Sequence, residues 1–304
     1  MEIAVLFNPV SGSGRAGRAA PPLADSLQRH GFSTRLVETR PGSADPWIGP
    51  ALEGVGGAVV LGGDGAVRTV APAAARAAVP IWHAPLGTEN LFARAFGMDA
   101  SHDRIVRAFR AVSVAEPGAV RAIDLGTAGD EHFAIMAGFG FDAHVVHELA
   151  RVRTGAITHL SYARPILRSL SEFSAPDLAW DIDGERESLG RGTIFVGNLR
   201  EYGARLDPTP DAVPDDGLLD ATFVPASDAL AFAAWAPILR LGLQTGPVGI
   251  GFGVRLRRGR RIRLLADRPT RLQLDGDPAG PSEGRCEVSL GIAPFRLRLA
   301  AARA

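Results

Sequence analysis

Apolar and polar positions follow one pattern in the first part of this chain and another in the second. Up to about residue 118, short apolar runs alternate with segments of helical periodicity. The pattern predicts strands at 3–7, 32–37, 58–61 and 81–84, and helices at 16–30, 45–52, 66–76, 89–96 and 101–111. Such alternation is typical of an α/β domain with a largely parallel sheet, which we expect over residues 1–118.

From residue 119 onward, short strands follow one another, and turns such as Asp183-Gly184 separate them. This part, residues 119–304, is expected to be a mainly antiparallel β-sandwich or distorted barrel. The expected helical interruptions lie at 143–151, 162–173 and 228–243. The last predicted strand, 295–299, is open between the second domain and a return to the sheet of the first.

Glycine-rich turns follow three of the strands predicted in the first domain. The most informative is Gly62-Gly63-Asp64-Gly65, between an apolar run and a predicted helix. Glycine lets the backbone approach a bulky anion, and a helix N-terminus favours negative charge, so this turn predicts a phosphate cradle. The turns at 8–17 and 85–94 follow two other strands. Since the carboxyl ends of parallel strands share one sheet edge, all three predict a single ligand site.

Composition narrows the chemistry that these turns can support. All 33 residues counted as lysine or arginine are arginine. The absence of lysine excludes a Walker P-loop, a protein kinase and Schiff-base catalysis, each of which needs that residue. The formal net charge of zero argues against nucleic acid as the main partner.

One cysteine, Cys286, excludes a disulfide framework. The first strand begins directly after the initiator, with no charged leader or apolar signal segment, and the longest apolar segment, 230–243, is too short to span a bilayer. We therefore expect a cytoplasmic protein, with peripheral contact at the inner face of the membrane left open. A monomer and a homodimer are both open.

Six different short motifs occur one after another over nearly the whole chain. They are Asn8-Pro9-x-Ser11-Gly12, Gly62-Gly63-Asp64-Gly65, Pro85-x-Gly87-Thr88-x-Asn90-x-x-Ala93-Arg94, Gly138-Phe139-Gly140-Phe141-Asp142-Ala143, Pro214-Asp215-Asp216-Gly217-Leu218-Leu219-Asp220 and Leu274-Asp275-Gly276-Asp277. In this order and spacing they resemble the diacylglycerol kinase catalytic domain family, which includes bacterial lipid kinases and sphingosine kinases. The resemblance implies transfer of the γ-phosphoryl group of ATP, with Mg²⁺, to the hydroxyl of a lipid alcohol.

The resemblance also implies roles for individual residues. Asp277 stands where the family has a glutamate proton acceptor, and Asp64 is the alternative base or a residue that orients ATP and magnesium. Val213, Asp216 and Leu218 match a structural magnesium site of some bacterial members. The residues implied at the ATP site are Asn8, Pro9, Ser11, Gly12, Thr39, Gly62, Gly63, Gly65, Ala66, Arg68, Thr69, Gly87, Thr88 and Asn90.

Departures from the family pattern leave other functions open. Ala66 replaces the usual threonine, and Asp277 is one methylene shorter than glutamate, so a catalytically weak nucleotide- or lipid-binding protein is one alternative. NAD kinase is another, because it shares the Gly-Gly-Asp-Gly turn. A Rossmann dehydrogenase is a third, because Gly12, Gly14 and Gly17 form a G-x-G-x-x-G pattern.

Two further patterns are ambiguous. His144, His147 and Glu148 have helical spacing for metal binding, but a solvated or cleft-lining helix face is the preferred interpretation. The arginine-rich run 255–263 predicts a basic hairpin, either solvated or docked on anionic lipid headgroups.

Overall fold

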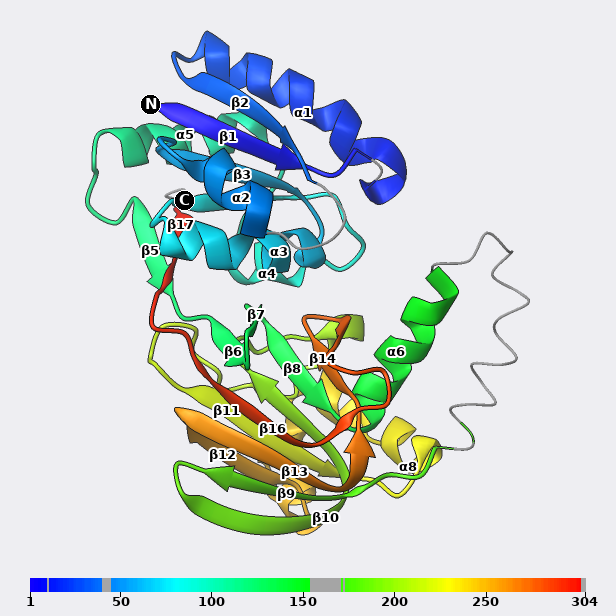
Figure 1. The fold of residues 1–304 in the computed structure, drawn as a ribbon. Helices are drawn as coiled ribbons and strands as arrows, with labels where there is room; N and C mark the ends of the chain where they lie inside the picture. Colours follow the sequence, from blue (N-terminus) through cyan, green and yellow to red (C-terminus); the bar gives the residue numbers. More distant parts are fainter. Residues whose placement is uncertain (10, 40–44, 154–170, 172, 302–304) are drawn as a thin grey trace. The chain divides into compact units, whose positions relative to one another are not determined.

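The chain forms two compact units in the computed structural model (Figure 1). The structure describes residues 1–9, 11–39, 45–153, 171 and 173–301. Unit 1 comprises Met1–Leu125 and Ala293–Ala304, and unit 2 comprises Gly126–Ile292. The boundary falls at Leu125 rather than at residue 118, because the strand that follows residue 118 pairs within the first sheet.

Unit 1 is built on a six-stranded sheet in the order β2-β1-β3-β4-β17-β5. The strands are β1 (Glu2–Phe7), β2 (Ser33–Glu38), β3 (Gly57–Gly62), β4 (Ile81–Pro85), β5 (Val120–Ile123) and β17 (Leu297–Ala300). All neighbours are parallel except the antiparallel pair β17–β5. Strands β1 and β3 are buried along almost their whole length, as expected where helices cover both faces of a parallel sheet.

Five helices cover this sheet. They are α1 (Ser11–Arg29), α2 (Asp45–Leu52), α3 (Asp64–Arg76), α4 (Leu91–Ala95) and α5 (His102–Ser113). Helices α1 and α5 contact each other on one face, and α2 packs against α3 on the other (Figure 1). The predicted α/β class with a largely parallel sheet is confirmed.

The final strand returns to unit 1, which decides between the two placements open from the sequence. Strand β17 lies between β4 and β5, with Leu299 opposite Ile81 on one side and Arg121 on the other. Its side chains Leu297 and Leu299 are buried in the core of this unit.

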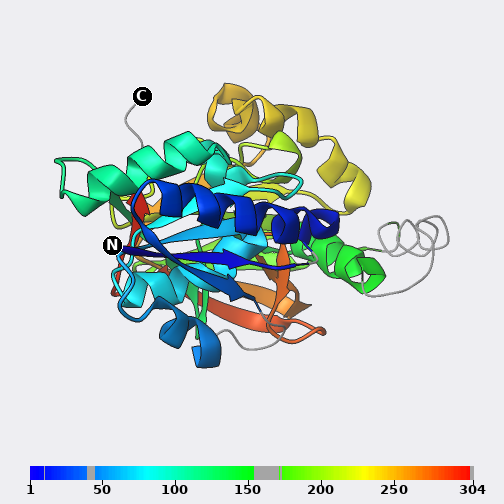
Figure 2. The same ribbon diagram turned by 90° about the horizontal axis from the view of Figure 1, so that it is seen from above.

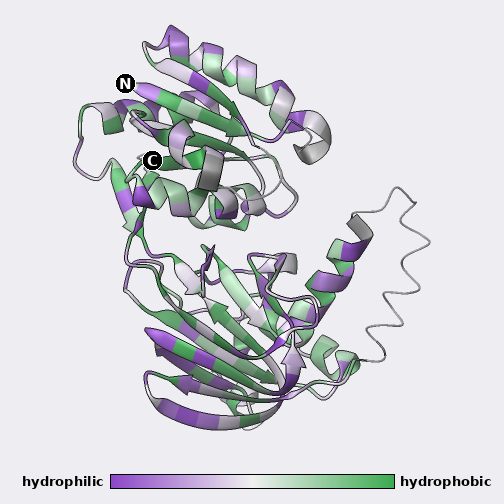
Figure 3. Ribbon diagram, viewed as in Figure 1, coloured by the Kyte–Doolittle hydropathy of each residue, from purple (hydrophilic) through white to green (hydrophobic). Residues whose placement is uncertain are grey.

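Unit 2 is antiparallel throughout its described strand pairs, as predicted. Its strands are β6 (Gly126–Ala128), β7 (Glu131–Phe133), β8 (Met136–Phe139), β9 (Asp177–Ile182), β10 (Glu185–Gly197), β11 (Leu219–Pro225), β12 (Arg255–Gly259), β13 (Arg261–Thr270), β14 (Leu272–Leu274), β15 (Asp277–Ala279) and β16 (Arg285–Ile292). Phe139, Trp180, Phe223 and Leu264 meet in its core. Hydrophobic residues run along the inner strands, whereas the arginine-rich strand β12 is hydrophilic (Figure 3).

The helix predicted at 143–151 is confirmed, whereas the one predicted at 228–243 is not. Helix α6 (Phe141–Arg153) follows β8, and η1 (Gly203–Arg205) lies in the loop before β11. The single helix predicted at 228–243 is wrong, because the chain forms α8 (Ala229–Ala233), α9 (Ala236–Arg240), η2 (Leu243–Thr245) and α10 (Pro247–Gly251). Pro237 lies in the first turn of α9, and Gly242 adopts a φ of 66°, so neither allows a continuous helix. The helix predicted at 162–173 falls almost entirely outside the described residues.

Candidate functional site

Two glycine-rich turns of unit 1 lie against each other at the carboxyl edge of the sheet. The N–H of Leu86 donates to the carbonyl of Gly62 over 2.8 Å. A Cβ atom on Gly87 would lie 2.6 Å from the Cα of Gly63, closer than real Cβ contacts. Neither glycine can therefore be replaced without moving backbone, which gives a packing reason for a pattern that the sequence linked only to phosphate.

Asp64 connects the same two turns. Its Oδ1 accepts the N–H of Phe92 over 2.9 Å, and its Oδ2 accepts the N–H of Leu91 over 3.0 Å. These are N–H groups at the start of α4, which have no partner within that helix, so Asp64 caps α4 from α3. Asn90 precedes α4 with a φ of 51°, and its side chain exchanges two hydrogen bonds with the backbone of Gly87. Thr88, implied at the ATP site, is exposed and is not the cap residue of α4.

The first turn joins the third turn through a side chain. Arg15, on α1, donates from Nη2 to the carbonyl of Leu86 over 3.0 Å. The structure therefore brings together the three predicted turns, which follow β1, β3 and β4. Ser11 and Gly12 begin α1, whereas Ala66, Arg68 and Thr69 lie in the first two turns of α3.

Other candidate residues have local structural tasks. The Thr69 hydroxyl donates to the carbonyl of Gly65 over 2.9 Å within α3. Buried His83 contacts the carbonyl of Gly62 through Nε2 at 3.0 Å. Burial lowers the pKa of His83, against the opposing effects of this bond and of the Asp64 charge. We therefore expect a neutral imidazole supporting the turn from below.

A cavity of about 1080 Å³ opens beside the first turn. Phe7, Pro9, Gly17 and Thr39 line it, and the Thr39 N–H donates to the carbonyl of Phe7 over 2.8 Å. The indole nitrogen of Trp47 is buried in its wall with no hydrogen-bond partner among the described residues. This cavity is large enough for part of a nucleotide, and it contains two residues that the family resemblance implied at the ATP site.

In unit 2, Asp277 is held on a tight hairpin. Strands β14 and β15 pair with Leu274 opposite Asp277, and only Asp275 and Gly276 join them, at φ values of 51° and 84°. A two-residue Asp-Gly turn with both φ angles positive favours the strand twist of a hairpin. The Asp275 carboxylate accepts the backbone N–H groups of Ala134, Ile135 and Met136 over 2.8, 2.9 and 2.9 Å, which fixes the turn to β8.

A polar chain of side chains supports the turn from within unit 2. Gln273 accepts the Gly276 N–H over 2.8 Å and donates to Asp142 Oδ2 over 2.9 Å. A Cβ atom on Gly138 would lie 2.1 Å from that same oxygen, so the glycine leaves room for the carboxylate. Gln273 was not singled out from the sequence, because a lone glutamine carries no pattern; the adjacent Asp-Gly turn is the signal that could have drawn attention to it.

Burial raises the pKa of Asp142 to about 7, although hydrogen bonds from Gln273 and Tyr202 favour its charged form. The pKa of the Tyr202 hydroxyl is also raised, first by burial and then by the Asp142 charge and hydrogen bond. The charges of Asp275 and Asp277 act on Tyr202 in the same direction. These four residues therefore form one electrostatically linked group.

In the predicted magnesium loop, an arginine forms an ion pair with the carboxylate of Asp216. Asp216 Oδ1 accepts the Leu218 N–H over 3.0 Å, and Oδ2 lies 3.2 Å from Nη2 of Arg258. The same guanidinium lies 3.1 Å from Asp220, and the Asp220 interaction raises the pKa of Arg258. A magnesium ion at Val213, Asp216 and Leu218 would therefore compete with Arg258 for the Asp216 carboxylate, and this metal site stays a prediction.

The candidate metal pair on α6 also has other partners. His147 Nε2 contacts the carbonyl of Leu272 at 2.8 Å, and Glu148 forms an ion pair of 2.7 Å with Arg271. No group of three or more metal-ligating side chains gathers anywhere in the described part of the chain. The helix-face interpretation is favoured.

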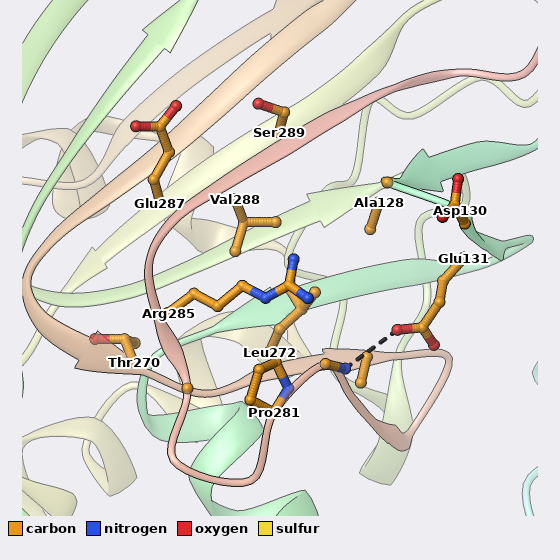
Figure 4. Close-up of a pocket in the computed structure, with 14 residues that line it drawn as sticks. Ala128, Asp130, Glu131, Thr270, Leu272, Pro281, Arg285, Glu287, Val288 and Ser289 are labelled. Carbon is orange, nitrogen blue, oxygen red and sulfur yellow. Dashed lines mark hydrogen bonds between the residues drawn. The ribbon is translucent and has the colours of Figure 1, made fainter.

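A second cavity, which the sequence did not predict, lies in unit 2 near the end of β15 (Figure 4). Its volume is about 570 Å³, and Arg285, Glu287 and Asp130 line it. Glu131 accepts the Gly280 N–H over 3.1 Å at its rim. None of the predicted site residues lines this cavity. Its mixed charged lining is unlike an acyl-chain pocket.

Known families and relatives match both parts of the chain. Residues 2–128 match the family model described as the diacylglycerol kinase catalytic domain, and residues 135–301 match that of the YegS C-terminal NAD kinase beta sandwich-like domain. A protein of Stenotrophomonas maltophilia named "Probable lipid kinase YegS-like" is 31% identical over 85% of this chain and 83% of its own length. The chain belongs to the YegS-like lipid kinase family.

Further relatives agree with this family assignment. A Xanthomonas oryzae protein of the same name is 31% identical over 90% of this chain and 88% of its own length. A crystal structure of a diacylglycerol kinase from Bacillus anthracis shares the fold with a TM-score of 0.68. At 16% identity, it covers 99% of this chain and 96% of its own. The predicted family, two-part fold and kinase class are confirmed.

Among the described residues, no helix is long and apolar enough to cross a bilayer.

Proposed function

We propose that the chain binds ATP at the three turns of unit 1 and transfers its γ-phosphoryl group to the hydroxyl of a lipid alcohol. The observation that carries the proposal is the hydrogen-bonded convergence of the turns after β1, β3 and β4 at one sheet edge. Backbone N–H groups there are suited to phosphate oxygens. The neighbouring cavity with Thr39 offers space for the rest of the nucleotide.

Asp277 is the proposed proton acceptor. The lipid oxygen bonds to the γ-phosphorus, the bond from that phosphorus to the β–γ bridging oxygen breaks, and ADP leaves. The hydroxyl proton passes to the Asp277 carboxylate and then to solvent. Asp64 is less suited to this role, because both of its oxygens hold the N-terminus of α4.

Charge on the phosphates must be offset without lysine. Arginines of α1 and α3, namely Arg15, Arg18 and Arg68, are the proposed side chains for this task, together with magnesium that accompanies ATP. Arg15 already lies at the edge, where it holds the Leu86 carbonyl. The proposed function needs no divalent ion at the Asp216 loop.

The test is phosphorylation of a lipid panel by the purified chain with radiolabelled ATP and magnesium. Diacylglycerol, phosphatidylglycerol, a sphingoid base and NAD are offered separately, and products are resolved by thin-layer chromatography. We expect label in a lipid and none in NADP. Label in NADP, or ATP binding without transfer to any lipid, would contradict the proposal.

Asp277→Asn should lower kcat by about 1000-fold while the KM for ATP and the thermal unfolding curve stay close to wild type. The matched control is Glu283→Gln, an exposed carboxylate near the same hairpin, for which we expect normal turnover. Equal kcat values for wild type and Asp277→Asn would remove Asp277 from the mechanism.

A further inference from the structure

The segment between β11 and β12 of unit 2 exposes an unusual concentration of large apolar side chains. Leu230, Leu241, Leu243, Ile250 and Phe252 are 82%, 69%, 51%, 55% and 70% exposed. They make up five of the eleven exposed large hydrophobic residues in the described part of the chain, within only 23 positions. Together we call these five residues the apolar face. Figure 2 shows the short helices of the segment, in yellow and gold, next to one another.

Other residues of this segment attach it firmly to unit 2, so the exposure does not come from loose packing. Leu239 and Val254 are buried, and the Trp235 indole donates to the carbonyl of Pro225 over 2.8 Å. Gln244 is also buried, and its side-chain amide donates to the carbonyl of Asp207. The segment is therefore held by one side while the apolar face meets solvent, an arrangement that marks interaction surfaces.

The stretch of chain that carries the apolar face is basic, although acidic residues from neighbouring parts of unit 2 pair with several of its arginines. Residues 229–266 contain seven arginines and no aspartate or glutamate, in a chain whose formal net charge is zero. Arg240 ends α9 directly before Leu241, is exposed, and has no ion pair among the described residues. Arg255 begins β12 three residues after Phe252 and remains about half exposed, although it lies 3.5 Å from Glu187.

From this arrangement we propose that the apolar face inserts into the surface of a membrane that carries anionic lipids. Apolar side chains on short helices enter the boundary between headgroups and acyl chains, while adjacent arginines contact the anionic headgroups. Exposed Arg240, which lies directly before Leu241, is the side chain best placed to contact such headgroups. This inference rests on the proposed function, because a lipid alcohol substrate resides in a membrane.

Vesicle sedimentation tests the inference without ATP or lipid substrate. The full chain is mixed with vesicles of phosphatidylcholine plus phosphatidylglycerol, or of phosphatidylcholine alone. We expect binding mainly to the anionic vesicles, weakened by salt. The double variant Leu241→Ser/Phe252→Ser should bind about tenfold more weakly. The matched control is Leu36→Ser/Val114→Ser, which alters exposed apolar residues of unit 1 and should bind as wild type does.

An activity measurement separates docking from catalysis. With a short-chain diacylglycerol that dissolves as monomers, the Leu241→Ser/Phe252→Ser variant should match wild type; with long-chain diacylglycerol in anionic vesicles it should be slower. Vesicle binding without any kinase activity would reject the proposed function and leave the docking inference standing. Equal vesicle binding by wild type and variant would overturn the docking inference, as would a wild-type dimer that the substitutions dissociate without changing vesicle binding.

Discussion

Four aspartates that occur in family-like motifs have different environments in the structure. Asp64 and Asp275 use both oxygens to accept backbone N–H groups, so they organise turns. Asp142 is linked to Gln273 in the interior of unit 2, and Asp277 extends from the hairpin that Gln273 and Asp275 hold. Motif spacing identified these carboxylates but not their partners, because the hydrogen bonds join residues 27 to 141 positions apart.

The raised pKa of Asp142 predicts a pH-dependent effect of its replacement. Its pKa of about 7 in the folded chain exceeds the value of about 3.9 expected when unfolded. The contribution of this group to stability is thus present at low pH and is lost as the pH rises through 7. Asp142→Asn stays neutral, so its melting temperature relative to wild type should increase by about 3 °C or more between pH 5 and 8.5.

Differential scanning fluorimetry at both pH values measures this change. The control is Asp267→Asn, because Asp267 is exposed and the neighbouring Arg268 lowers its pKa rather than raising it. That control should not gain stability at high pH. A melting-temperature difference for Asp142→Asn that does not vary with pH would show that Asp142 titrates normally.

At the scale of elements, local patterns predicted most strands and the three turns, because periodicity and glycine placement are local properties. The prediction of one helix at 228–243 was wrong, because Pro237 and Gly242 interrupt an apolar run that is otherwise typical of a helix. The tether from Asp64 to α4 and the arginine at the Asp216 loop depend on tertiary contacts. No periodicity within a single segment could reveal them.

The contact between the two glycine turns predicts a selective effect of a single methyl group. Gly87→Ala places a Cβ atom 2.6 Å from Gly63 Cα, so backbone must move, at a cost of roughly 1–3 kcal/mol. We expect a lower melting temperature and a KM for ATP raised about tenfold. Gly49→Ala is the matched control, because no atom lies within 4 Å of its added Cβ. Equal KM values for the two variants would show that the contact between the turns does not affect nucleotide binding.

The arginine at the Asp216 loop predicts how stability responds to metal. Because Arg258 already forms ion pairs with both Asp216 and Asp220, magnesium and EDTA should leave the wild-type melting temperature unchanged in the absence of nucleotide. Arg258→Ala should unfold at a lower temperature and regain stability when magnesium is added. Arg263→Ala, which removes another half-exposed arginine with acidic partners, should not respond to magnesium. Magnesium stabilisation of the wild type would instead support the predicted metal loop.

At the scale of the molecule, the order of motifs along the chain predicted the family. The sequence did not show which of the two units the last strand joins. The chain leaves unit 1 after β5 and returns to it as β17, which pairs with both β4 and β5. Parallel pairing between strands distant in sequence leaves no local pattern. Leu297 and Leu299 are buried, but their apolar character alone could not show which sheet they join.

The returning strand predicts that unit 1 depends on the end of the chain. A protein that ends at residue 292 lacks β17, so β4 and β5 lose their shared neighbour and expose unpaired edges. We expect it to aggregate, or to lose the cooperative unfolding of unit 1 in urea. A protein that ends at residue 301 is the control and should unfold like the full chain. Normal solubility and unfolding of the shorter protein would show that β17 is dispensable.

The capping of α4 by Asp64 has a consequence for the thermodynamics of nucleotide binding. Since this carboxylate joins two of the three turns through hydrogen bonds within the chain, little conformational entropy would be lost there on binding of a triphosphate at the proposed site. Interaction free energy with the phosphates then contributes to affinity instead of being consumed in ordering a loop. A short acidic side chain directly after two glycines would thereby give the proposed ATP site a shape that forms when the chain folds.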